Sequence, residues 1–111
     1  MLIYHITTRS AWETAQTTGT YTAPSLAAEG FIHASTAEQV AGTANLLFKG
    51  QPGLVLLCLE VEKLLPKLRY ELAPGTDQKF PHIYGPLNLD AVVMVLDFAP
   101  AADGAFHFPL S

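Results

Sequence analysis

The chain has 111 residues, 50% of them hydrophobic and 14% charged, which excludes a disordered protein and favours a single globular domain over residues 1–111. Its formal net charge is −4 and it has no run of like charges, so a nucleic-acid partner is not expected. The longest apolar run, Leu54–Leu59, is far shorter than a membrane span, and the N-terminus lacks the pattern of a signal peptide, so we expect a cytoplasmic protein without a membrane partner.

The first two elements are expected to be a strand and a helix. Leu2–Thr7 alternates between two faces, which predicts a strand. Ser10 followed by Glu13 is typical of a capping box at the start of a helix, and Gly19 is a plausible residue to end that helix. Residues 20–30 are punctuated by proline and glycine, so we expect a loop there.

A second strand and helix follow. Gly30–Ser35 is expected to be extended, and a helix should then begin at Ser35 or Thr36, with Glu38 or Gln39 completing a capping box. The apolar residues of this helix recur at helical spacing: they are Val40, Ala41, Ala44, Leu47 and Phe48. Two glycines then break the pattern.

The rest of the chain is expected to be mainly strands. We expect Gly53–Val61 and Ala91–Phe98 to be buried strands, because unbroken apolar runs are typical of strands covered on both faces. Leu68–Leu72 alternates, and Phe106–Leu110 is a candidate short edge strand. The lone cysteine, Cys58, falls within the first apolar run and should be part of the core. The order of elements indicates an α+β domain with two main helices packed on a mixed, mostly antiparallel sheet.

One motif occurs three times: a histidine is followed two positions later by a hydroxyl-bearing residue. Side chains at i and i+2 of a strand share a face, so each copy would place an imidazole beside a hydroxyl. If the three faces converge, they form a polar cleft with acid, base and hydrogen-bonding groups. Each copy also has an ordinary structural explanation, as a satisfied strand histidine, a helix cap or a turn residue. The copies are His5-Ile6-Thr7, His33-Ala34-Ser35 and His82-Ile83-Tyr84.

Four chemistries could use such a cleft. Three histidines could bind zinc, but the spacing lacks the helical pattern and no cysteine pair supports it, so we expect no metal. Ser35 could be a nucleophile, although it is not set between the glycines that commonly surround one. Paired histidines also act as base and acid in two-histidine phosphoesterases, whose motifs lie farther apart in longer chains. The fourth chemistry is group transfer from a dinucleotide such as NAD.

Several stretches of the chain resemble the DUF952 family of small, mostly bacterial proteins of unassigned function. The resemblance covers nearly the whole chain. It rests on IYHIT, the helix from Trp12 to Gly19, EGFIHAST followed by Glu38-Gln39, Ala44-Asn45 and Phe48, LVLLCLEV, Tyr70-Glu71 and FPHIYGPLNLDAVV. The family is in turn similar to the ADP-ribosyltransferase fold, including NAD-using RNA 2′-phosphotransferases. The resemblance therefore implies an ADP-ribosyltransferase-like fold, with NAD as a substrate and no tightly bound cofactor.

The same resemblance implies roles for individual residues. IYHIT resembles the element that holds the NAD ribose, so His5 would contact the ribose and Thr7 would assist. GFIHAST resembles a second motif, which would place His33, Ser35 and Thr36 near nicotinamide or phosphate. Related enzymes usually supply a glutamate from a late strand.

At that late position this chain departs from its relatives. It offers His82 and Tyr84 instead of a glutamate, and the nearest upstream carboxylate is Glu71. The departure fits either a divergent transfer enzyme or a non-catalytic module that binds a nucleotide or a small anion.

Chemical reasoning adds further candidates. Cleavage of a nicotinamide–ribose bond develops positive charge on the sugar, which the carboxylate of Glu71 could stabilise. Phe31 or Tyr84 could stack on the leaving ring. Arg9 or Arg69 could bind a phosphate. The sequence leaves the substrate, the acceptor and the oligomeric state open.

Overall fold

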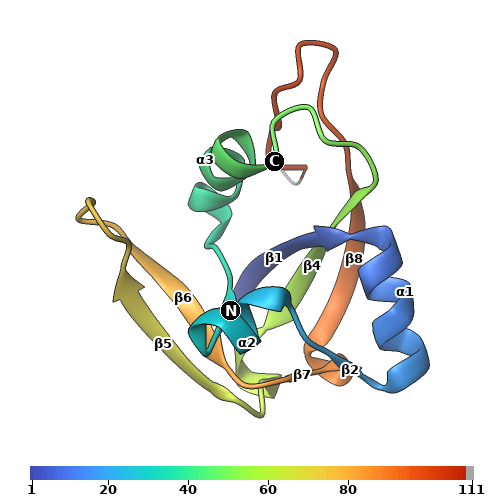
Figure 1. The fold of residues 1–111 in the computed structure, drawn as a ribbon, viewed down its shortest axis with the longest axis vertical. Helices are drawn as coiled ribbons and strands as arrows, with labels where there is room; N and C mark the ends of the chain where they lie inside the picture. Colours follow the sequence, from blue (N-terminus) through green and yellow to red (C-terminus); the bar gives the residue numbers. More distant parts are fainter. Residues whose placement is uncertain (110–111) are drawn as a thin grey trace.

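The computed structural model describes residues 1–109. Strands and helices alternate through the first half of the chain, and strands dominate the second half (Figure 1). In chain order the elements are β1 (Leu2–Thr8), α1 (Arg9–Thr18), β2 (Thr20–Tyr21), α2 (Pro24–Glu29), β3 (Ile32–His33), α3 (Ala37–Leu47), β4 (Leu54–Glu60), the 3₁₀ turn η1 (Val61–Lys63), β5 (Lys67–Leu72), β6 (Lys79–Tyr84), β7 (Leu87–Asn88), the 3₁₀ turn η2 (Leu89–Ala91) and β8 (Val92–Phe98).

The strands form separate small sheets rather than the single mixed sheet expected from the sequence. Within residues 1–109 the sheet orders are β1-β4-β8, β2-β7 and β3-β6-β5, and every pairing is antiparallel. Gly85 and Pro86 follow β6 and turn the chain away, so that β7 pairs with β2 instead of extending the sheet of β6. The α+β class and the antiparallel pairing are confirmed, whereas the single sheet is wrong.

The core lies on both faces of the β1-β4-β8 sheet. One cluster joins alternate residues of β1 and β4, such as Ile3 and Leu57, to Ala15 of α1. The other joins the intervening strand residues to Val40 and Ala44 of α3. Figure 1 shows α1 and α3 on opposite sides of this sheet. The alternation expected for the first strand and the burial of the central strand, with Cys58 inside it, are confirmed.

Both main helices have side-chain caps, one of which differs from the expectation. α1 is capped by Thr8, whose hydroxyl accepts a hydrogen bond from the backbone N–H of Ala11, and not by Ser10. The reason is that α1 begins at Arg9, directly after β1, so Ser10 already lies inside the first turn. Gly19 ends α1 at a φ of 90°, as expected. α3 has the expected capping box, formed by Thr36 and Gln39.

Residues 20–30 are more regular than the loop expected there. They contain β2 and the six-residue helix α2, which has Pro24 in its first turn and ends at Gly30 with a φ of 92°. Proline suits the first turn of a helix and glycine suits its C-terminal cap. These residues therefore mark the two ends of a short helix rather than a loop.

Two expectations for the second half of the chain are wrong. β8 is the outer strand of its sheet, and it is not buried on both faces, because Val93 and Met94 are 45% and 43% exposed. A β-bulge interrupts its pairing with β4 between Cys58 and Leu59. Residues 106–109 form no strand, and residue 110 lies outside the described residues.

Phe106 is nevertheless well anchored. It is 1% exposed, and its backbone N–H and carbonyl are both bonded to the side-chain amide of Asn45 in α3. These two bonds satisfy the backbone N–H and carbonyl of Phe106, which would otherwise pair with a neighbouring strand.

No helix within residues 1–109 is long and apolar enough to cross a membrane.

Candidate functional site

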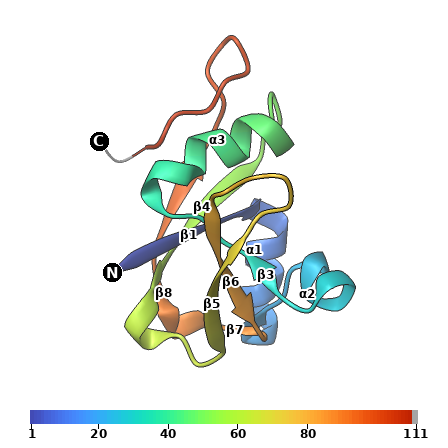
Figure 2. The ribbon, with the colours of Figure 1, turned by 90° about the vertical axis from the view of Figure 1, so that its left-hand side faces the viewer.

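A cavity of about 890 Å³ lies between β1, the α2–β3 segment, α3 and the β5–β6 arm. Figure 2 shows this arm toward the viewer, with α3 above it and α2 at its side. His5, His33 and His82 all line this one cavity, although they come from three different strands. The three faces that carry the repeated motif therefore converge.

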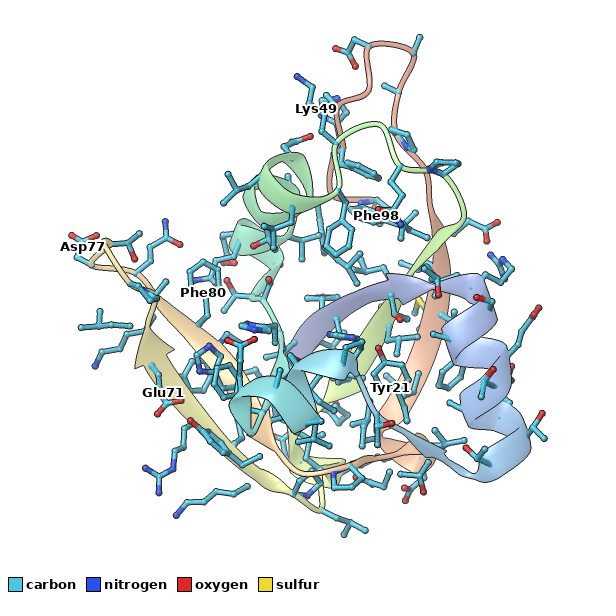
Figure 3. All side chains as sticks on the ribbon, viewed as in Figure 1. Tyr21, Lys49, Glu71, Asp77, Phe80 and Phe98 are labelled. Carbon is cyan, nitrogen blue, oxygen red and sulfur yellow. The ribbon has the colours of Figure 1, made fainter. Side chains whose placement is uncertain are left out.

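Most of the residues singled out from the sequence also line the cavity. They are Thr7, Phe31, Ser35, Glu71 and Tyr84. Figure 3 places Glu71 on the β5–β6 arm and Tyr21 on the opposite side of the interior.

Arg9 and Thr36 are not brought to the cavity. The Arg9 guanidinium pairs with the exposed carboxylate of Asp97 on β8. Thr36 is used as the cap of α3. Both residues therefore already have partners that account for their positions.

Glu71 is the centre of a hydrogen-bonded cluster on the β5–β6 arm. Antiparallel pairing of these strands places Glu71 on the same face as His82 and Tyr84. His82 Nδ1 lies 2.8 Å from Glu71 Oε1, and the Tyr84 hydroxyl donates to the same oxygen. The bonds from Tyr84 and His82 hold the pKa of Glu71 below its ordinary value, whereas Glu71 raises the pKa of Tyr84.

The hydrogen bond to Glu71 fixes the tautomer of the neutral His82 ring. Glu71 is a carboxylate that can only accept, so Nδ1 of His82 carries the ring proton that it donates. In neutral His82 the Nε2 atom is then a lone-pair acceptor. A carboxylate that orients a histidine in this way prepares its other nitrogen to take up a proton.

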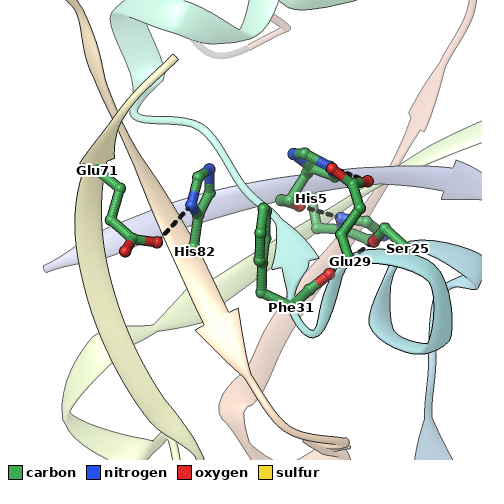
Figure 4. Close-up of polar contacts among 7 residues, drawn as sticks. His5, Ser25, Glu29, Phe31, Glu71 and His82 are labelled. Atoms are coloured by element: carbon green, nitrogen blue, oxygen red, sulfur yellow. Dashed lines mark hydrogen bonds and ion pairs between the residues drawn. The ribbon is translucent and has the colours of Figure 1, made fainter. Parts of the chain in front are cut away.

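A second histidine–glutamate pair lies next to the first. His33 Nε2 is 2.9 Å from Glu29 Oε2, four residues earlier in the chain. The rings of His33 and His82 have centroids 5.5 Å apart. Phe31 packs against both: its ring is stacked on His82 with centroids 3.9 Å apart (Figure 4). The same ring lies edge-on to His33 at 4.9 Å.

His5 is held differently from the other two histidines. It is 7% exposed, close to the 8% of His82, but its ring has different partners: its Nδ1 lies 2.5 Å from the backbone carbonyl oxygen of His33. Its Nε2 lies 2.7 Å from the hydroxyl of Tyr21, which is itself 2.9 Å from Thr7 Oγ1. A carbonyl only accepts, so Nδ1 of His5 carries the proton. Both ring nitrogens therefore have partners within the protein.

Burial controls the charge of His5. Desolvation lowers its pKa from 6.5 to about 4, against an opposing contribution from the His33 carbonyl. His5 is therefore neutral at pH 7 and links β1 to β3. Ser35 strengthens this link, because its backbone exchanges two 2.8 Å hydrogen bonds with Tyr4 of β1.

Sequence reasoning assigned no role to two residues of the site. Tyr21 lies on a two-residue strand within the expected loop, and it carries no pattern of its own. The spacing of Glu29 and His33, four residues apart, was the available signal for their pairing. Among residues 1–109 no group of three or more His, Cys, Asp or Glu side chains is placed to hold a metal ion.

The fold and the cavity define a small α+β protein whose histidine–glutamate pairs line one pocket. The chain belongs to the DUF952 family, whose profile is described as a protein of unknown function and matches residues 6–95. His33, Glu71 and His82 lie within the matched range, and His5 lies just before it.

Solved structures of protein CC0527 from Caulobacter crescentus are similar over nearly the whole chain. A crystal structure of that protein is 39% identical, with a TM-score of 0.87, and the match covers 96% of this chain and 94% of that one. A solution NMR structure of CC0527 is 40% identical, with a TM-score of 0.82 and coverage of 94% and 90%. No curated protein matches the chain.

Proposed function

We propose that the cavity binds the nicotinamide–ribose end of NAD or a related nucleotide and that the protein breaks the bond between base and ribose. The ribosyl group would pass to an acceptor hydroxyl or to water, as an ADP-ribosyltransferase-like fold would imply. One observation carries the proposal: the His82–Glu71 and His33–Glu29 pairs face one cavity of about 890 Å³. Proton-transfer groups gathered in one large pocket are typical of active sites.

The proposed step balances without a further reactant. The bond between C1′ of ribose and the nicotinamide nitrogen breaks, and its electron pair leaves with the nicotinamide, which becomes neutral. The oxygen of water or of an acceptor hydroxyl then forms a bond to the cationic C1′. Its proton passes to Nε2 of His82, whose Nδ1–H is held by Glu71.

Glu71 is the residue that we assign to the cationic sugar. Its Oε1 atom is fixed by His82 and Tyr84. No hydrogen bond to its Oε2 atom occurs among residues 1–109, so this oxygen is free to face a ligand. A carboxylate placed against developing positive charge stabilises the transition state more than the ground state. Glu71 would thus fill the role that a late-strand glutamate fills in ADP-ribosyltransferases.

His5 receives a positioning role in this proposal instead of the ribose contact expected from the sequence. Its ring bonds to the His33 carbonyl and to Tyr21, so neither nitrogen is left for a ligand. By holding the backbone at His33, it fixes the second histidine–glutamate pair relative to β1.

The test combines binding with product release. Calorimetric titration of NAD, ADP-ribose and a 2′-phosphate-bearing nucleotide measures binding, and chromatography measures free nicotinamide. We expect Glu71→Gln to weaken ligand binding by no more than about 10-fold but to lower nicotinamide release by roughly 10²–10³-fold, since it removes the charge and keeps an acceptor. Glu13→Gln, at an exposed position of α1, is the matched control and should leave both unchanged.

The outcomes separate the hypotheses. Binding without nicotinamide release in the wild-type protein would favour a non-catalytic binding module. Failure of every nicotinamide-containing ligand to bind would overturn the proposal.

A further inference from the structure

The cavity wall formed by the described residues carries negatively charged side chains and no lysine or arginine. Apart from histidine, its formally charged residues within residues 1–109 are Glu29 and Glu71, and no lysine or arginine is among them. Glu71 is kept ionised by its bonds from Tyr84 and His82. A wall of this kind favours a cation and disfavours an anion.

The nearest basic side chains lie outside the cavity wall. Arg9 is engaged with Asp97. Arg69 lies over the ring of Tyr84, with its guanidinium carbon 5.7 Å from the ring centroid, and does not line the cavity. The recognition of phosphate usually relies on arginine, lysine or free backbone N–H groups.

The N-terminus of α1 has one of its N–H groups already engaged within the protein. α1 begins beside the cavity, where Thr8 and Ala11 line the wall. The Ala11 N–H already donates to the Thr8 hydroxyl at 3.1 Å. The capping threonine thus occupies a donor that an anion would otherwise bind.

The wall also carries aromatic rings. Phe31, Tyr21 and Tyr84 line the cavity together with Glu29 and Glu71. Aromatic faces and carboxylates both attract a flat, positively charged ring. A volume of about 890 Å³ is well within the range of small-molecule pockets.

We infer that the unit recognised by this cavity is a cationic N-riboside, a nucleoside whose base is positively charged at the glycosidic nitrogen, and that phosphate groups lower its affinity. The inference rests on the proposed function and narrows its substrate class. The phosphates of a dinucleotide would lie outside the cavity, in water. Their charge would be repelled by Glu29 and Glu71 at any position near the wall.

Three ligands that share one nicotinamide ring test this inference. Nicotinamide riboside has no phosphate, nicotinamide mononucleotide adds one at the 5′ position, and dihydronicotinamide riboside lacks the positive charge. Calorimetric titration at pH 8 and low salt leaves the effects of charge largely unscreened. We expect the riboside to bind at least about 10-fold more tightly than either of the other two.

Variants locate the source of the preference. Glu29→Gln and Glu71→Gln should each reduce the advantage of the cationic riboside over its dihydro form by about 5- to 10-fold. Arg69→Ala is the matched control and should leave the binding of nicotinamide mononucleotide unchanged, because we assign no phosphate contact to Arg69.

The outcomes distinguish this inference from the proposed function. If the mononucleotide or NAD binds as tightly as the riboside, or if Arg69→Ala weakens the mononucleotide selectively, the inference is wrong and nicotinamide–nucleotide binding stands. If the dihydro riboside matches the cationic one, charge recognition is wrong. If no nicotinamide-containing ligand binds, both the inference and the proposed function are wrong.

Discussion

Acidification from pH 8 to pH 4 should remove about 3 kcal/mol of unfolding free energy through His5 alone. Burial lowers the pKa of His5 from 6.5 to about 4 in the folded protein. The unfolded chain therefore takes up a proton first, at the ordinary pKa, and folding becomes less favourable as the pH falls. The contribution is complete above pH 6.5 and is lost between 6.5 and about 4, and each pKa unit corresponds to about 1.4 kcal/mol.

Urea unfolding at several pH values between 8 and 4 measures this loss. The variant His5→Asn cannot titrate, although its amide can still donate to the His33 carbonyl. It should be less stable than the wild type at pH 8, and its stability should fall by about 3 kcal/mol less on acidification. His107→Asn, at an exposed position, is the matched control and should keep the wild-type pH dependence.

Glu71 responds in a different pH window from His5. The pKa of Glu71 is held below its ordinary value of 4.5, so its contribution is present above 4.5 and is lost only on further acidification. The interval from pH 6.5 to about 4.5 therefore reports mainly on His5. An equal loss of stability in the wild type and in His5→Asn across that interval would refute the reasoning. So would an NMR titration of His5 with a midpoint near 6.5.

Five further substitutions test the packing and the caps by urea denaturation. Thr8→Ala should cost about 1 kcal/mol by removing the cap of α1, whereas Ser10→Ala should cost less than about 0.5 kcal/mol, and equal losses would contradict the assigned cap. Gly85→Ala would bring a Cβ to 2.9 Å from a proline side chain and should lower the free energy of unfolding by about 1–3 kcal/mol. Gly42→Ala lies in open space on α3 and should raise the free energy of unfolding by about 0.5–1 kcal/mol. Phe106→Ala should cost about 3–5 kcal/mol because its ring is 1% exposed, and a loss below about 1 kcal/mol would show that the segment is not part of the core.

The local features of the fold could be read from the sequence because they depend on neighbouring residues. The alternation of β1, the capping box at Thr36 and the stop at Gly19 each follow from a few adjacent side chains. The convergence of the three histidine motifs on one cavity was also anticipated, since strand faces that carry polar side chains tend to meet where water or a ligand can reach them.

The pairing of the strands could not be read in this way. The composition of an apolar run such as β8 does not show whether the strand has a neighbour on one edge or on both. The outer position of β8 and the exposure of Met94 depend on segments that are distant in the sequence. The short helix α2 was missed because Pro24 and Gly30 punctuate loops and helix ends alike.

The partners within the site depend on the same distant contacts. Tyr21 reaches His5 from a strand that pairs with β7, more than sixty residues later in the chain. Glu29 meets His33 because α2 folds back beside β3. Residue type and spacing identified the histidines, whereas tertiary packing decided which partners each ring binds.

The bulge in β8 affects the tendency of this protein to aggregate at high concentration. An outer strand presents a row of unpaired backbone groups, and a regular row can template the addition of a strand from another chain. β8 combines this position with two exposed apolar side chains, Val93 and Met94. The bulge breaks the regular spacing at Val93, and such breaks increase local twist. The irregularity thus works against edge-to-edge aggregation at the place where this sheet is most open to it.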